Sequence, residues 1–464
     1  MSALPRTTRR RMFYLMLLLF LVVVPLTILY SQGYIVDFGN QQLRPTGGIF
    51  LKTRQAGDRV YIDGVFQRET SFVSRGVLVT NLQPGRYALR VERDGARSWE
   101  KVLRVTDGEV LEFRDIFLPP ATVTPRVIFN ARRNEPARLE RLAGRSEIVL
   151  TVGDRSRPAT VFAIDPLARF APTNFIRVSH WQWDESSGAF IIGRRAEGRT
   201  RWFRFRMSAG SARREEPITF RGLPAGFSAD ALIPHPTAAD FFYFAAGGAL
   251  FFQGSARVPS PIAEQVATFA VGPDRMYFLS TNGFFVETDL GGQNTKIRGR
   301  TGLFIDGERP VEMRITPARD LIILDAAGEL FTYQPGRDEE LQFVAGNVAG
   351  VDFDAAGTRM LYWDQGRLWM YWLRDNTAQP FDISRTKRQI FFSEEPIRQA
   401  FLNANGSHVF FLTERGIRVV EADTRGSTNA HDLVVGTVKT FAIDPDTLLL
   451  HWVEGSVVKQ AELE

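Results

Sequence analysis

Residues 348–373 have the sequence VAGVDFDAAGTRMLYWDQGRLWMYWL. An apolar run is followed by a turn of Asp, Ala and Gly, by a strongly apolar run, by a polar turn and by a third apolar run. Short apolar runs bounded by Gly, Asp and Asn are typical of β-strands joined by tight turns. The stretch therefore predicts three consecutive antiparallel strands.

The same unit recurs throughout residues 121–464. Further copies start at residues 178, 229, 267, 311, 397 and 438. The first residues of the middle strands are Phe190, Phe241, Met276, Leu321, Met360, Val409 and Leu448, and a weaker copy has Ile148 there. The six intervals between Phe190 and Leu448 average 43 residues. A period of about 40–50 residues with four strands per unit is typical of a β-propeller.

The length of the repeating region predicts the number of blades. At 43 residues per unit, the 344 residues of 121–464 correspond to eight blades. Seven is the alternative, if the weak first copy is only a linker. No long helical pattern interrupts the region, so we expect it to be all-β.

The last repeat predicts how the ring closes. It contains three strand-like runs, at 438–443, 447–453 and 456–462, so a fourth, outer strand is missing. The apolar run 122–130, directly after the Pro119-Pro120 linker, belongs to no complete unit. An open strand edge is normally covered. We therefore expect 122–130 to pair with the last strand and to close the ring as a composite blade; Pro125 is tolerated in an outermost strand.

Residues 45–118 show a different pattern, with about seven short strands between turn signals. The Asp63-Gly64 pair predicts a tight hairpin turn. A second turn is predicted at Pro84-Gly85, with Pro fixing φ and Gly85 adopting a positive φ. Tyr61 and Tyr87 are expected in the core. A small antiparallel β-sandwich is the predicted fold.

This segment resembles the PEGA domain family. The resemblance lies in GGIFLKTRQAGDRVYIDG at 47–64, LVTNLQPGRYALRVERDG at 78–95 and WEKVLRVTDGEV at 99–110. The tetrapeptide that names the family is replaced here by Gln55-Ala-Gly-Asp58. The resemblance implies a surface module without catalytic residues, in which Asp63, Gly64, Pro84 and Gly85 are structural turn residues.

The N-terminal residues predict a membrane anchor. Residues 12–36 contain no charged side chain, and four arginines (Arg6, Arg9, Arg10 and Arg11) precede them. We expect a transmembrane helix at 12–34 in the lipid bilayer, with the basic tail 1–11 in the cytoplasm and the later domains outside. A cleaved signal peptide is the alternative, but no pair of small residues follows the apolar run.

Composition excludes several classes of function. The formal charge is +5, and the four N-terminal arginines account for all but +1 of it, so a basic surface for nucleic acid is not expected. There is no cysteine, and the five histidines have no metal-ligand spacing. The adjacent acids Asp184 and Glu185 fall in a turn of the repeat. We therefore expect no catalytic residue, no metal site and no cofactor.

The aromatic residues of one repeat have two interpretations. Trp363, Trp369 and Trp372 could form a platform for a sugar ligand. Because alternate residues of a strand face opposite sides, the rings are expected instead to pack between blades.

Together these features predict a non-enzymatic, single-pass protein of the cytoplasmic membrane. It would present a PEGA-like spacer at 45–118 and a propeller at 121–464 outside the membrane, to bind an envelope protein or a cell-wall glycan. The alternatives are a glycan hydrolase or lyase acting at the propeller mouth, and a purely structural subunit of a membrane complex.

Overall fold

The computed structural model describes residues 6–31, 34–37, 42–130, 137–141, 148–152, 159–164, 175–178, 180–184, 187, 189–196, 199–206, 214–220, 222–223, 227–254, 258–300 and 312–464. Residues 1–5 of the predicted tail, residues 32–33 of the predicted membrane segment and Glu185 lie outside them. The chain forms two compact units. Unit 1 comprises Met1–Thr122, Asn376–Asp382 and Asp423–Asn429, and unit 2 comprises the remaining residues.

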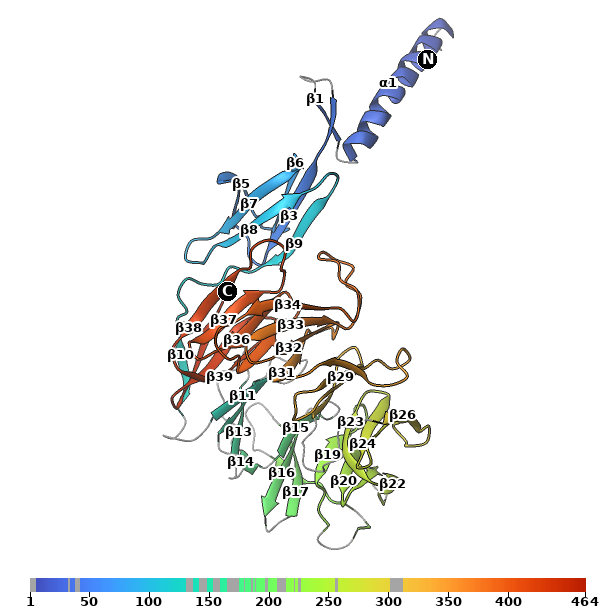
Figure 1. Ribbon diagram of the computed structural model, residues 1–464, viewed down its shortest axis with the longest axis vertical. Helices are drawn as coiled ribbons and strands as arrows, with labels where there is room; N and C mark the ends of the chain where they lie inside the picture. Colours follow the sequence, from blue (N-terminus) through green and yellow to red (C-terminus); the bar gives the residue numbers. More distant parts are fainter. Residues whose placement is uncertain are drawn as a thin grey trace, which may run out of the picture. The chain divides into compact units, whose positions relative to one another are not determined.

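Unit 1 begins with a single helix, α1 (Arg6–Ser31), followed by a hairpin of β1 (Tyr34–Asp37) and β2 (Gln42–Pro45) (Figure 1). The helix continues through Pro25. Its side chains from Met12 to Val23 are largely exposed and apolar. Among the described residues, no helix is long and apolar enough to cross a membrane.

The rest of unit 1 is a β-sandwich of two sheets. One sheet has the order β6-β3-β9 and the other β5-β4-β7-β8. The strands are β3 (Gly47–Thr53), β4 (Arg59–Ile62), β5 (Val65–Glu69), β6 (Gly76–Leu82), β7 (Gly85–Glu92), β8 (Trp99–Val105) and β9 (Val110–Ile116). Alternating side chains of both sheets, among them Ile49, Val60 and Trp99, are buried in one core. The predicted sandwich is confirmed, but the expectation that it is wholly antiparallel is wrong, because β3 and β9 pair in parallel.

The turn predictions of this module have different outcomes. Asp63 and Gly64 have φ values of 48° and 78° and join β4 to β5, as predicted. The expectation for Gly85 is wrong: it begins β7 without a positive φ, and Asn81 adopts the left-handed conformation instead, with φ 65°. The short polar side chain of asparagine tolerates this conformation. Asn81 lies within β6, where the pairing with β3 shifts register.

The two tyrosines also differ from the expectation. Val60 and Ile62 point into the core, so alternation turns Tyr61 to the opposite face, where its ring lies 5.7 Å from Phe66 and 5.0 Å from the Arg90 guanidinium. Placing Tyr61 in the core was therefore wrong. Tyr87 packs half-buried against the core and donates its hydroxyl hydrogen to the Gln83 carbonyl at 2.8 Å.

Unit 2 contains eight four-stranded sheets among the described residues, the predicted number. Seven sheets use consecutive strands: β11 (Ala137–Arg141), β12 (Ile148–Val152), β13 (Ala159–Ile164), β14 (Phe175–Val178); β15 (His180–Asp184), β16 (Ala189–Ala196), β17 (Arg199–Arg206), β18 (Arg214–Pro217); β19 (Ala231–Pro234), β20 (Phe242–Ala246), β21 (Ala249–Gln253), β22 (Ser260–Ala263); β23 (Val266–Val271), β24 (Arg275–Ser280), β25 (Phe284–Asp289), β26 (Lys296–Arg300); β27 (Glu312–Ile315), β28 (Leu321–Leu324), β29 (Leu330–Tyr333), β30 (Gln342–Ala345); β31 (Gly350–Phe353), β32 (Arg359–Trp363), β33 (Arg367–Trp372), β34 (Lys387–Phe392); β35 (Gln399–Leu402), β36 (His408–Leu412), β37 (Gly416–Glu421), β38 (Ala430–Val435).

The eighth sheet has the order β10-β41-β40-β39 and joins the two ends of the repeating region. Its strands are β10 (Arg126–Asn130), β39 (Val438–Ile443), β40 (Leu449–Glu454) and β41 (Val457–Glu462). β10 pairs antiparallel with β41, with Arg126 opposite Gln460 and Asn130 opposite Val457. Pro125 precedes the strand, so no ladder bond is lost to it. The predicted composite blade is confirmed.

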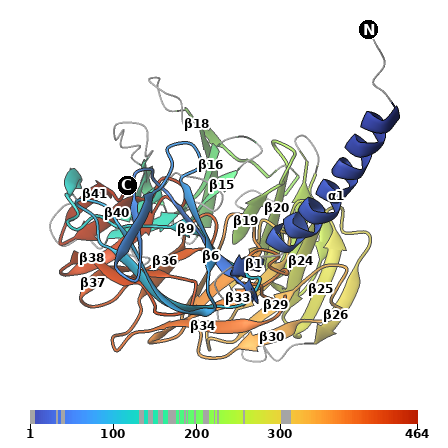
Figure 2. The same cartoon turned by 90° about the horizontal axis from the view of Figure 1, so that it is seen from above.

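The sheets form a closed ring. The first strands of neighbouring sheets contact each other: β23 with β27, β31 with β35, β35 with β39, and β39 with β11. The last contact includes a hydrogen bond from the Leu139 N–H to the Thr440 hydroxyl at 3.3 Å. Figure 2 shows the sheets following one another around this ring. The part of the chain that the structure describes is thus all-β apart from α1, and unit 2 is a β-propeller.

Candidate functional site

Each propeller sheet has two ends that carry different loops. Because its strands are antiparallel, the turn from first to second strand and the loop from third to fourth strand lie at one end, here called the AB/CD end. The turn from second to third strand and the connection to the next sheet lie at the other, the BC/DA end. Loops carried by a rigid scaffold are where binding residues usually lie.

Recurrent Asp and Asn residues stabilise the turns between first and second strands. The Asp354 carboxylate accepts hydrogen bonds from the N–H groups of Thr358 and Arg359 at 2.7 and 3.0 Å. Asp184 occupies the same place in its sheet and accepts from the Ser187 N–H at 3.3 Å. Such side-chain bonds to the backbone explain the Asp and Asn of the repeat. The buried Asp184 is thus a turn residue, as expected.

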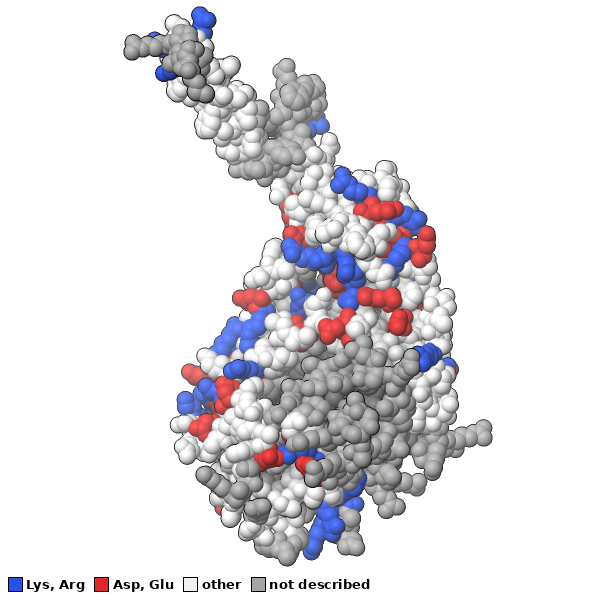
Figure 3. All heavy atoms as spheres, turned by 180° about the vertical axis from the view of Figure 1, so that it is seen from behind, with Lys and Arg blue, Asp and Glu red and all other residues white. Residues whose placement is uncertain are grey.

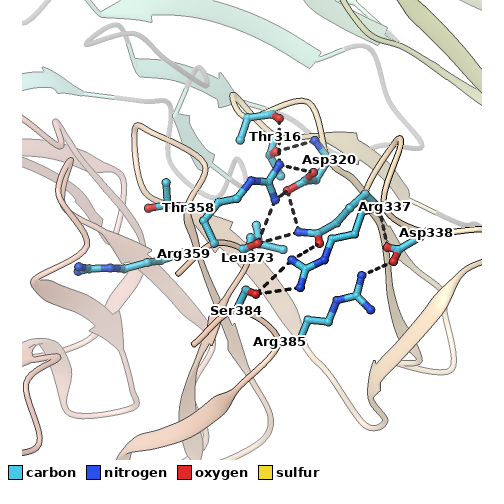
Figure 4. A network of polar contacts seen from close by, with 12 residues as sticks. Thr316, Asp320, Arg337, Asp338, Thr358, Arg359, Leu373, Ser384 and Arg385 are labelled. Atoms are coloured by element: carbon cyan, nitrogen blue, oxygen red, sulfur yellow. Dashed lines mark hydrogen bonds and ion pairs between the residues drawn. The ribbon is translucent and has the colours of Figure 1, made fainter. Parts of the chain in front are cut away.

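A polar network connects two neighbouring sheets at the AB/CD end (Figure 4). Asp320, fully buried after the β27–β28 turn, receives two hydrogen bonds from the Arg374 guanidinium of the β33–β34 loop, at 2.7 and 2.8 Å. The Gln334 amide donates to the Leu373 carbonyl at 2.7 Å and to Asp320 at 3.4 Å. Burial raises the pKa of Asp320 above its usual range, while Arg374 acts in the opposite direction.

Two more arginines complete this network. Both terminal nitrogens of Arg337 donate to the Ser384 hydroxyl at 3.1 Å, and Arg385 pairs with Asp338 (Figure 4). The Asp375 carboxylate accepts from the Ser384 N–H at 2.7 Å, and this backbone bond lowers the pKa of Asp375. Each charge therefore has an opposite charge close by. The network joins two blades, and its chemistry is that of structural ion pairs.

A second buried carboxylate joins other strands in the same way. Glu287 of β25 pairs with Arg275 of β24 and with Arg298 of β26 at 2.7 Å, and it accepts from the Tyr333 hydroxyl at 2.8 Å. Tyr333 belongs to β29 in the next sheet. Burial opposes ionisation of Glu287, but the three donors outweigh burial and lower its pKa. Glu287 is therefore an ionised link between two blades.

The three tryptophans of the suggested sugar platform lie in different places. Trp363 and Trp372 are buried, with exposed fractions of 7% and 5%, in a core shared with β36. Trp369 is half-buried and stacks on Tyr362, with ring centroids 6.1 Å apart. Two buried rings cannot stack on a sugar, so the structure does not bring the three together as a platform.

Among the residues that the structure describes, no group of three His, Asp or Glu side chains could hold a metal ion. Basic and acidic side chains are interspersed on the face shown in Figure 3. Sequence reasoning missed the polar network, because Asp320, Arg374 and Ser384 are far apart in the sequence and belong to no motif. The only signal was their place in corresponding loops of adjacent repeats.

Comparison with known proteins finds one family model and several similar solved structures. Residues 46–117 match the PEGA domain family model. No curated protein matches the chain. One similar solved structure is Sqt1 of Chaetomium thermophilum bound to the N-terminus of ribosomal protein L10: identity 12%, coverage 68% of this chain and 93% of that chain, TM-score 0.44. Another is BamB of Moraxella catarrhalis: identity 12%, coverage 74% and 99%, TM-score 0.42.

Proposed function

We propose that the protein is a non-enzymatic binding scaffold of the cell envelope. The observation that carries this proposal is the closure of the propeller by β10, which turns repeated sheets into one rigid ring. A rigid ring holds the loops at its ends in fixed positions, and such loops suit the binding of a partner. The PEGA-like module serves as the spacer between this ring and the N-terminal helix.

The membrane anchor is part of this proposal. It is supported by the apolar sequence of α1 from Met12 onward, by the four arginines in the first turns of this helix and by the exposed apolar side chains along Met12–Val23. Residues 37–464 would then lie outside the cytoplasmic membrane, tethered without cleavage. Protease added to intact spheroplasts should remove this part and leave a short membrane-bound stub. Full protection, or a mature N-terminus near Ser31, would contradict the topology.

We place the binding surface at the BC/DA end of the propeller. At the AB/CD end, the network around Asp320 occupies loops of two neighbouring sheets with paired charges. The BC/DA end carries exposed polar residues in short turns, such as Asn282, Gln365 and Glu414. The partner would be an envelope protein or a cell-wall glycan.

A matched pair of positions on one sheet tests this placement. Glu414 lies in the β36–β37 turn at the BC/DA end, and Asn405 lies in the β35–β36 turn at the AB/CD end; both side chains are exposed. A photo-crosslinking amino acid at 414 should give a defined crosslinked product in intact cells, and the same amino acid at 405 should not. Equal crosslinking at both positions, or a product only at 405, would rule out the BC/DA end.

A further inference from the structure

Two segments from the later part of the sequence are integral to the PEGA-like unit. Asn376–Asp382 lies in the loop between β33 and β34, and Asp423–Asn429 lies in the loop between β37 and β38. Within unit 1 these segments contact β9 and β8, the edge strands of the two sandwich sheets. Edge strands present unpaired N–H and C=O groups, which other chain segments can satisfy.

The contacts resemble the pairing of an added strand with each sheet edge, but the side chains of the two segments make the hydrogen bonds instead of their backbone. At β9, the Gln379 amide donates to the Val110 carbonyl at 2.8 Å and accepts from the Glu112 N–H at 3.0 Å. At β8, Asn429 accepts from the Glu100 N–H at 2.9 Å, and the Ser427 hydroxyl donates to the Glu100 carbonyl at 3.0 Å. The segments thus satisfy backbone groups on both edges.

A buried lysine specifies the backbone of the second segment. Lys101 occupies a core-facing position of β8 and is 1% exposed. Its ammonium group donates to the carbonyls of Asp423 and Arg425, both at 2.8 Å. A buried ammonium is costly unless acceptors surround it. These two carbonyls therefore hold Lys101 in place. Because both must point at one ammonium group, the backbone of 423–425 has to curve around it.

Two residues of the segment add specificity. The Arg425 guanidinium lies 4.3 Å from the Phe113 ring centre and donates to the Glu112 carbonyl at 2.6 Å and to Gln379 at 2.7 Å. Gly426 has φ +70°, and a Cβ there would lie 2.7 Å from the Val102 carbonyl. An arginine followed by a glycine is thus required by stacking and by close approach.

We infer that the β8–β9 edge of the PEGA-like module is a peptide-recognition site for a short Asp-x-Arg-Gly-Ser-x-Asn segment, which residues 423–429 fill within the same chain. In this site, Lys101 binds two backbone carbonyls of the segment, and Phe113 and Glu112 bind the Arg425 guanidinium. The backbone of Glu100 binds the side chains of Ser427 and Asn429. It is separate from the proposed partner surface at the BC/DA end.

Lysine labelling of the full chain in detergent tests the inference. The sequence has six lysines, and Lys52 and Lys439 are exposed controls. With an acetylating reagent and mass spectrometry, Lys101 should react about tenfold or more slowly than these two. Replacing 423–429 with a Gly-Ser stretch of equal length should abolish the protection. The same replacement at 290–295, the β25–β26 loop of unit 2, should leave Lys101 protected.

Recognition is then tested in trans. A synthetic peptide of residues 421–431 should restore protection of Lys101 in the Gly-Ser variant, and the peptide carrying Arg425→Ala should not. The double variant Ser427→Ala/Asn429→Ala, which removes the bonds to Glu100, should raise Lys101 labelling several-fold without changing Lys439. The inference is overturned if Lys101 stays protected in both variants. It is also overturned if the peptide gives no protection while Lys439 labels as in the parent.

Discussion

The two units treat the edges of their sheets differently. In the propeller, first strands pack against neighbouring sheets, as β23 does with β27 and β39 with β11. The outer strand pairs with the third through a shifted register in seven of the eight described sheets. Bulges of this kind twist an outer edge and discourage further pairing. In unit 1, two edges instead receive side-chain hydrogen bonds from segments far away in the sequence.

The difference shows which edges a repeat can protect by itself. A repeating blade contains its own bulge and its own outer strand. The protection of the outer sheet edge therefore recurs in each sequence repeat. The small sandwich has no neighbour of its own kind, and its β8 and β9 edges are covered by segments from the β37–β38 and β33–β34 loops. Local pattern therefore governs the propeller, and long-range complementarity governs unit 1.

The largest expected effect comes from breaking the composite blade. Replacing Arg126–Asn130 with Gly and Ser in the soluble chain 42–464 removes the pairing with β41 and opens the ring. We expect unfolding free energy to fall by roughly 3–5 kcal/mol, from lost ladder bonds and apolar burial, and association through the bared β41 edge. Denaturant unfolding and light scattering measure these two changes.

The matched control is an outer strand that does not close the ring. Replacing Lys296–Arg300, which is β26, in the same way should cost less, because β25 remains held between β24 and the next sheet. If both replacements cost the same and the chain stays monomeric, then β10 is an ordinary outer strand and the special role given to the composite blade is wrong.

The number of blades and the composite blade were predictable, because strand-like runs can be counted in the sequence. The period of 43 residues predicted eight blades, and the three runs of the last repeat left one strand to be supplied by residues 122–130. The same counting cannot locate a turn conformation. It placed positive φ at Gly85, whereas the positive φ lies at Asn81 within β6, where the pairing with β3 shifts register, and local pattern does not specify where a ladder shifts.

The sites were not predictable in the same way. The bond between Asn429 and Glu100 joins residues 329 positions apart, and that between Gln379 and Glu112 spans 267 positions. Neither pair has a recognisable sequence spacing, and neither belongs to a sequence motif. One signal was present: Lys101 falls at a core-facing position of an alternating strand, where a charged residue requires buried partners. The identity of those partners depends on tertiary structure.

The second prediction concerns pH and the composite blade. His451 of β40 is fully buried, and burial lowers its pKa to about 4 from 6.5. The unfolded chain therefore binds a proton at a higher pH than the folded chain, so this stability is present above pH 6.5 and is lost as the pH falls toward 4. Between pH 7 and 5 we expect a loss of about 2 kcal/mol, measured by denaturant unfolding at each pH.

His451→Phe should remove most of this pH dependence, because the phenylalanine ring does not titrate. His235→Phe is the control: burial also lowers the pKa of His235, but this ring is only half-buried, so the change should be smaller. An unchanged pH dependence in His451→Phe would show that another group titrates, and the composite blade would then have no special sensitivity to acid.

The smallest effect separates two turns of the PEGA-like module. Gly64 has φ +78° with open space around it, so Gly64→Val costs backbone strain alone, roughly 1–2 kcal/mol. Gly85 has no positive φ, and a Cβ there would meet its neighbours at 3.8 Å, an ordinary contact. Gly85→Val should therefore change stability by less than about 0.5 kcal/mol, because a β-branched residue suits the start of a strand. Thermal unfolding of the two variants beside the parent measures the difference. A larger loss for Gly85→Val than for Gly64→Val would mean that Gly85 needs the positive φ that the sequence predicted at Pro84-Gly85.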